Sequence, residues 1–71
     1  MTDRVIFWDG TYGGQVREVD GASNGVLTFW FQDGDDRWGE RYYTLGNTTV
    51  ADPESGSPLP VFQYVERVKA R

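Results

Sequence analysis

Hydrophobic and polar positions alternate along this chain over short distances, most clearly in the segment VLTFWFQ (26–32). One side of an extended strand over this segment carries only Leu27, Phe29 and Phe31, and that side is predicted to face the core or its open mouth. Trp30 falls on the opposite side between polar neighbours. It either covers a second small cluster or is exposed and functional.

Four further segments are rich in β-branched and aromatic residues and predict strands. They are residues 4–8 (RVIFW), 14–19 (GQVREV), 41–45 (RYYTL) and 48–51 (TTVA). The final segment, residues 61–71, is ambiguous, because as a helix it would place Val61, Val65 and Val68 on one side. We favour a strand there, since β-branched and aromatic residues dominate its first half.

Turn-forming residues separate these segments, because Asn, Asp and Gly tolerate the backbone angles of tight reversals. The pairs Asp-Gly, Asn-Gly and Gly-Asn that mark such turns begin at residues 9, 20, 24, 33 and 46. A longer loop is predicted over residues 52–60 (DPESGSPLP), where three prolines disfavour a ladder. Gly13 and Gly14 are predicted to bend the second strand, the alternative being that they allow a ligand or another backbone to approach closely. The pattern predicts an all-β fold, a small five- to six-stranded antiparallel SH3-like barrel forming one domain over residues 1–71.

The composition restricts the chemistry available to the chain. Its 71 residues include no cysteine and no histidine, which excludes disulfides, the usual zinc ligands, thiol catalysis and imidazole acid–base catalysis. No nucleophile motif and no glycine-rich phosphate loop is present. We therefore expect a protein that is not an enzyme and has no cofactor. Four Phe, four Tyr and three Trp are expected to close a core that buries only about 60–65% of the unfolded surface.

The formal net charge of −4 argues against non-specific binding to nucleic acid, which depends on basic side chains. It is compatible with a basic protein partner. No apolar run is long enough to span a bilayer, and the first ten residues, MTDRVIFWDG, contain no apolar stretch of signal-peptide length. We expect a cytoplasmic protein that does not contact membranes.

The segments VIFWDGTYGGQV, REVDG, GVLTFWFQDGDD and RYYTL resemble the Tudor-like branch of small SH3-like barrels over residues 4–45. The shared pattern is an aromatic end to the first strand, an Asp-Gly turn, a tyrosine before the second strand, and a third strand that ends in aromatic-x-Asp-Gly-Asp. The resemblance implies a strongly bent five-stranded barrel. It also implies an aromatic cage for a methylated lysine or arginine.

By this resemblance, the cage positions are Trp8, Tyr12 and Phe31, with Asp33 or Asp35 as the carboxylate. Such rings bind a cation through their negative faces. The alternative is that the same rings only fill the core of a small domain. Outside the cage, the second choice of partner-binding residues is Trp30 and Trp38.

Two charged segments are candidate sites. The acidic segment DGDDRWGE (33–40) does not match a calcium loop, because Arg37 and Trp38 stand at a ligand and a glycine position. It is interpreted as a solvated hairpin tip or as an acidic lip for a cationic side chain. Arg67, Lys69 and Arg71 would form a basic stripe on a terminal strand, or simply be solvated.

The sequence favours a binding module that recognises a protein partner through an aromatic and acidic surface, without chemistry on the ligand. One alternative is a small acidic inhibitor, of the kind phages and mobile elements encode, that blocks a basic enzyme surface through residues such as Asp33, Asp35 and Asp36. Another is a structural subunit of a virion or other assembly. The ligand and the oligomeric state are not specified by the sequence.

Overall fold

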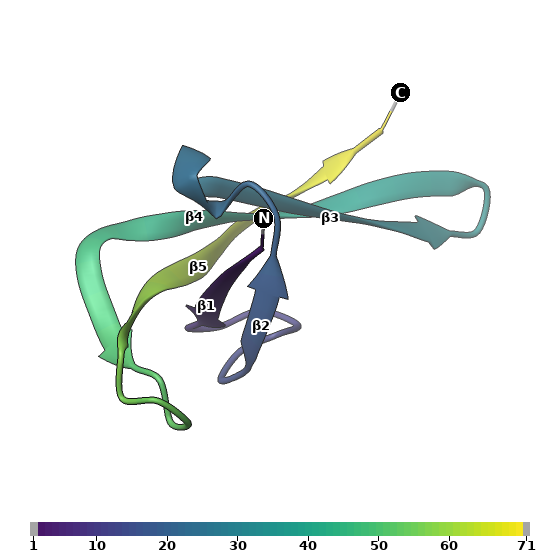
Figure 1. The fold of residues 1–71 in the computed structure, drawn as a ribbon. Coiled ribbons are helices and arrows are strands. Elements are labelled where there is room, and N and C mark those ends of the chain that lie inside the picture. Colours follow the sequence, from purple (N-terminus) through teal and green to yellow (C-terminus); the bar gives the residue numbers. More distant parts are fainter. Residues whose placement is uncertain (1, 71) are drawn as a thin grey trace.

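The computed structural model describes residues 2–70 and shows one sheet of five strands (Figure 1). The strands are β1 (Asp3–Phe7), β2 (Val16–Val19), β3 (Val26–Asp33), β4 (Asp36–Ala51) and β5 (Pro58–Lys69). The only helical element among these residues is the short 3-10 turn η1 (Ala22–Asn24), and no helix in the described chain has the length and apolar character to cross a membrane. The predicted all-β class is confirmed.

The sheet is open, with the strand order β2-β1-β5-β4-β3. The predicted closed SH3-like barrel is not confirmed, because the two edge strands β2 and β3 have no ladder between them in the described residues. The pairing is antiparallel except between β1 and β5, which run parallel at Ile6↔Val61 and Phe7↔Phe62. The predicted all-antiparallel sheet is therefore corrected at its centre.

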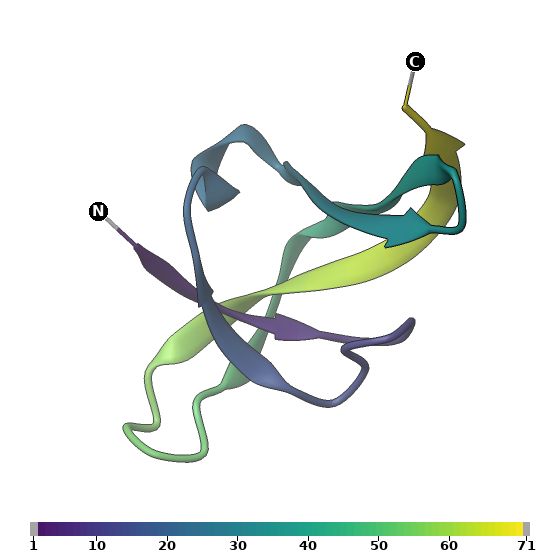
Figure 2. The ribbon, with the colours of Figure 1, turned by 90° about the vertical axis from the view of Figure 1, so that its right-hand side faces the viewer.

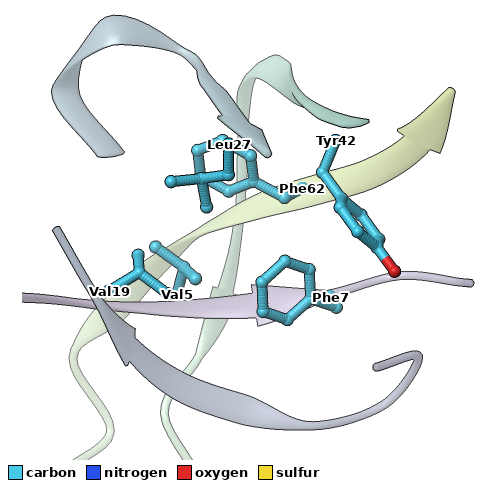
Figure 3. Packing of buried hydrophobic residues seen from close by; sticks show 6 residues of the cluster. All are labelled: Val5, Phe7, Val19, Leu27, Tyr42 and Phe62. Carbon is cyan, nitrogen blue, oxygen red and sulfur yellow. The ribbon is translucent and has the colours of Figure 1, made fainter. Parts of the chain in front are cut away.

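The sheet curls around one buried cluster to which every strand contributes (Figure 3). Its members are Val5, Phe7, Val19, Leu27, Tyr42 and Phe62. Val19 and Leu27 come from opposite edges of the sheet, so the two edges must approach each other across the concave face. Burial of these side chains supplies most of the hydrophobic stabilisation available to so short a chain.

The long strand β4 differs from its prediction. Residues 41–45 and 48–51 were expected as two strands joined by a turn at Gly46-Asn47, but they belong to one continuous strand. The pairing with β5 is instead irregular between Thr44 and Thr49, and Gly46 takes a φ of 60° within it. The glycine thus bends a strand where the dipeptide suggested a reversal.

The proline-rich loop is also shorter than predicted. Pro58 and Pro60 lie within β5, opposite Ala51 and Thr49. The ladder between β5 and β1 begins only at Val61, so each proline has a strand neighbour on one side alone and its missing N–H is tolerated. The preference for a strand over a helix in the terminal segment is confirmed.

The remaining loop, residues 52–57, is held by a buried carboxylate. Asp52 accepts two hydrogen bonds from the Arg4 guanidinium, at 2.8 and 3.1 Å, and one from the Glu54 amide at 2.9 Å. These hydrogen bonds lower the pKa of Asp52 to about 2. The loop is therefore fastened to β1 by a charge-assisted contact.

Beyond the core, the far ends of three strands extend as a narrow projection (Figures 1 and 2). We call residues 30–39 of β3 and β4, with residues 67–69 of β5, the ribbon, and the remainder the body. The molecule measures 42 × 23 × 20 Å along its principal axes. No ribbon residue belongs to the buried hydrophobic cluster.

Candidate functional site

A hollow of about 220 Å³ lies where the concave face of the sheet meets the β1–β2 loop. Four aromatic residues, one hydroxyl and one carboxylate line it: Tyr12, Phe29, Trp30, Phe31, Thr11 and Glu40. A volume of this size fits one side chain of a partner better than a whole small-molecule ligand, which usually needs about 300–1,000 Å³.

The β1–β2 loop is fixed in place by bonds to β5. The Trp8 amide donates to the carbonyl of Phe62 at 2.9 Å, and the Asp9 carboxylate accepts from the amide of Tyr64 at 2.7 Å. The Asp9 side chain thereby extends the parallel β1–β5 pairing by one more link. This anchors the loop that carries Thr11 and Tyr12.

Gly10 is required for that loop conformation. Its φ is 78°, a region that residues with a Cβ rarely adopt. A Cβ at this position would lie 2.7 Å from the Tyr42 hydroxyl oxygen and 2.9 Å from the Cβ of Tyr64. The loop backbone therefore packs directly on the buried Tyr42 and the half-buried Tyr64, and no larger residue fits.

The aromatic wall of the hollow continues into the core. The Tyr12 ring lies 4.9 Å from the ring of Phe29 and 5.6 Å from that of Phe7, in tilted and edge-to-face arrangements. Phe29 in turn contacts Phe7 and Tyr42 at 5.7 Å. These contacts hold the lining rings in fixed positions before any ligand arrives.

Glu40 supplies the negative charge of the hollow. This half-buried carboxylate accepts a hydrogen bond from the Thr11 hydroxyl at 2.9 Å. Within residues 2–70 no Lys or Arg nitrogen forms an ion pair with it. Burial raises the pKa of the neighbouring Tyr42 phenol, the Glu40 charge raises it further, and the amides of Thr11 and Tyr12 oppose the shift.

Two rings of the hollow already carry a cation on a face. The Arg17 guanidinium lies 4.5 Å from the Tyr12 ring centre. Arg67 lies 5.0 Å from the centre of Phe31 and 4.4 Å from that of Trp38. The faces of these rings are thus positioned to attract positive charge, which is the physical requirement for a cation site.

The structure brings together only part of the cage suggested by the sequence. Tyr12 and Phe31 line the same hollow, and Trp30 is also among its lining residues. Trp8 does not line it: its side chain is 67% exposed, and no ring within the described chain stacks on it. Gly13 and Gly14, expected within the second strand, lie in the loop that precedes it.

The indole of Trp30 belongs to the convex face of the ribbon. It covers Gly39, where a Cβ would lie 2.9 Å from the indole ring and 2.8 Å from a methyl group of Thr28. The Arg37 guanidinium lies 5.6 Å from the indole. Trp30 is still 46% exposed, so the indole covers a glycine and remains at the surface.

The acidic hairpin tip is largely neutralised by the terminal strand. Asp33 pairs with Arg67 at 3.0 Å and Asp36 pairs with Lys69 at 3.2 Å, whereas Asp35 is exposed in the turn. Among residues 2–70, no group of three acidic side chains is placed to hold a metal ion. Arg71, the third member of the predicted basic stripe, lies outside the described residues.

Thr11, Phe29 and Glu40 were not among the site residues expected from the sequence. Phe29 was expected on the core face, and residues 33–40, which contain Glu40, were expected as a hairpin tip, not as part of a strand. Alternation in the segment WGERY would have placed Glu40 on the face of Trp38 and Tyr42, the concave one. Thr11 reaches Glu40 because the β1–β2 loop folds across the sheet. No pattern in the sequence predicts the path of this loop.

A second hollow, of about 320 Å³, lies between Asp3, Arg4, Ala22, Ser23 and Pro60. It contains no aromatic ring. Its one cationic side chain, Arg4, is already bound to Asp52. The first hollow therefore has the stronger features of a recognition site.

Comparisons with protein-family models, with curated proteins and with solved structures gave no significant match to this chain.

Proposed function

We propose that this protein is a non-enzymatic binding module that takes a cationic side chain of a protein partner, a lysine, an arginine or a methylated form, into the hollow beside Glu40. The observation that carries the proposal is a half-buried carboxylate without an ion-pair partner in the described chain, set among aromatic rings. In this proposal the curled sheet is a Tudor-like module and its concave face is the binding side.

The energetics favour a cationic guest over a neutral one. A carboxylate that is partly removed from water gains more from an arriving positive charge than an exposed carboxylate does. Aromatic faces add about 0.5–2 kcal/mol for a cation placed over them. The net charge of −4 also attracts a basic partner at long range.

The acidic-inhibitor alternative has less support. It requires the hairpin-tip carboxylates to be free for a basic surface, but Asp33 and Asp36 are paired with Arg67 and Lys69. Breaking those pairs would offset part of the gain from a new partner. Glu40 is the carboxylate that lines the aromatic hollow.

The proposal can be tested with four capped amino acids as probes, titrated into isotope-labelled protein and followed by NMR. They are the Nα-acetyl amides of lysine, trimethyllysine, arginine and norleucine, the last a neutral control. We expect the cationic probes to shift the amide signals of Thr11, Tyr12 and Glu40 and to bind about tenfold more tightly than norleucine.

Two variants of equal charge make the test specific. Glu40→Gln should remove the preference for cations, whereas Glu18→Gln, which removes the same charge from an exposed position on β2, should keep it. Arg67→Gln should strengthen cation binding, because it uncovers a face of Phe31. Equal binding of norleucine, shifts that map away from the hollow, or no binding at all would refute the proposal.

A further inference from the structure

Strand β3 is an edge strand whose outer backbone groups can be identified. Hydrogen-bonded and non-hydrogen-bonded pairs alternate along an antiparallel ladder, and the Thr44 amide donates to the Gly25 carbonyl at 2.9 Å. The β3–β4 register continues from that pair without a shift to Asp33↔Asp36. Every second residue of β3 therefore directs its N–H and C=O away from β4. These residues are Val26, Thr28, Trp30 and Gln32.

The two edges of the sheet are protected to different degrees. β2 is four residues long and includes Arg17 and Glu18, and a short, charged edge resists pairing with other chains. β3 is eight residues long, contains no proline and no bulge, and bears its single charge at the terminal Asp33. An edge of this length whose one charge lies at its end is a template for an added strand.

The open edge adjoins the hollow. Phe29, Trp30 and Phe31, which line the hollow, are consecutive residues of β3, and Thr11 and Tyr12 of the β1–β2 loop stand across from them. A segment paired to β3 would direct every second side chain toward the concave face, beside Phe29 and Phe31. One such side chain would then enter the hollow and approach Glu40.

We propose that β3 binds an extended segment of a partner protein as a sixth strand, and that a lysine or arginine at one concave-facing position of that segment fills the hollow. The choice of side chain rests on the function proposed above, whereas the pairing of backbones rests on the β3 edge alone. Recognition then combines main-chain hydrogen bonds, which give affinity for any extended chain, with one pocket that selects the sequence.

A second copy of this protein fits the same edge less well. The strand it would bring, VLTFWFQD, contains no Lys or Arg, so Glu40 would receive no cation. Two copies would also each carry a net charge of −4. The space beside the first part of β3 is further limited, because η1 packs against that strand. The accessible part therefore runs from about Thr28 to Gln32, room for a segment of roughly five residues at about 3.3 Å each.

The test begins with a displayed library of random linear decapeptides, selected on the wild-type protein. For a selected peptide, each backbone amide is methylated in turn in synthetic versions, and binding is measured by calorimetry. Loss of about tenfold or more at every second amide, with little change at the amides between, is the expected result, because only alternate amides face β3. Losses without this period of two would overturn strand addition.

Variants of the protein provide a second readout. Thr28→Pro removes an outward N–H of β3 that the β4 ladder does not use, and should weaken the peptide at least tenfold. Glu18→Pro makes the same change on the outer side of β2 and should not affect binding. Circular dichroism verifies that each variant is folded. If Thr28→Pro is unfolded, the amide scan on wild-type protein decides alone.

The two proposals fail separately. Selected peptides with the period of two but no lysine or arginine preference would retain strand addition and overturn the cation site. Selected peptides that prefer lysine or arginine, but show no period of two in the amide scan, would retain the cation site and overturn strand addition. If the library yields no binder, or if light scattering shows wild-type dimers that Thr28→Pro dissociates, the edge does not bind a partner segment as proposed.

Discussion

The body and the ribbon share three strands, but they are stabilised in different ways. In the body, side chains such as Phe7 and Phe62 are completely buried and contact residues from every strand. In the ribbon, large side chains such as Phe31 and Trp38 lie at the surface under the guanidinium of Arg67. The rings of the ribbon therefore contribute less to hydrophobic stabilisation than those of the body.

The largest expected effect is a difference in the free energy of unfolding between one substitution in the body and one in the ribbon. Phe7→Ala should cost about 3–5 kcal/mol of unfolding free energy, because it leaves a cavity in the cluster. Phe31→Ala should cost about 1 kcal/mol or less, since the ring is already 36% exposed. Urea titration followed by circular dichroism measures both. Similar losses would show that the ribbon and the body are one packing unit.

The next effect concerns the contact of Trp30 with Gly39. Gly39→Ala would place a methyl group 2.8–2.9 Å from Thr28 and the indole, and should cost about 1–3 kcal/mol through displacement of the ring. In a Trp30→Ala background part of this cost should disappear, and a double-mutant cycle measures the difference. Additive effects would mean that the indole does not cover the glycine in solution.

Acid should weaken the contact between Arg4 and Asp52 in the body. The pKa of Asp52, about 2 in the folded protein, lies below its ordinary value of 3.8. The Arg4–Asp52 contact therefore stabilises the fold above pH 3.8, and this stabilisation is lost as the pH falls through 2. Thermal melts between pH 5 and about 2 should show this loss as a fall in melting temperature. The variant Asp52→Asn should melt at a lower temperature than the wild type at neutral pH, and its melting temperature should change less over this pH range.

The smallest expected effect lies in the ribbon. Arg67→Gln removes a guanidinium from two rings and from Asp33. It should cost about 0.5–1 kcal/mol, because Phe31 and Asp33 are exposed and Trp38 is only half-buried. Arg37→Gln, which removes a cation from Trp30 alone, is the control and should cost less. Hydrogen exchange of ribbon amides measures both, and faster exchange confined to residues 30–39 would support the division into two regions.

The fold class could be predicted because it depends on local signals. Alternation in residues 26–32, β-branched residues near the C-terminus and Asp33-Gly34 all act over a few neighbours, and the hairpin indeed turns at Gly34 with a φ of 63°. Whether the sheet closes depends on how β2 and β3 meet, which is a relation between distant segments. The sequence predicted two strands where β4 is continuous, because Gly46-Asn47 is a local turn signal. Pairing of β4 with β5, on either side of this dipeptide, keeps the chain extended instead.

The candidate site could be predicted only in part. Tyr12, Phe31 and Trp30 were singled out for their ring type, and they do line one hollow. The position of Trp8 depends on the path of the loop after β1, where Asp9 bonds to Tyr64 across 55 residues of sequence. Glu40 lies on β4 and accepts a hydrogen bond from the Thr11 hydroxyl of the β1–β2 loop. No spacing in the sequence indicates this contact.

The central place of β5 in the sheet has a consequence for synthesis on the ribosome. β5 joins β1 on one side and β4 on the other, yet it is made after all the other strands. A nascent chain that stops before residue 58 has both halves of the sheet and nothing to connect them. Translation must therefore proceed through β5 before native structure can form, and until then the β3 segment is open to pairing with other chains.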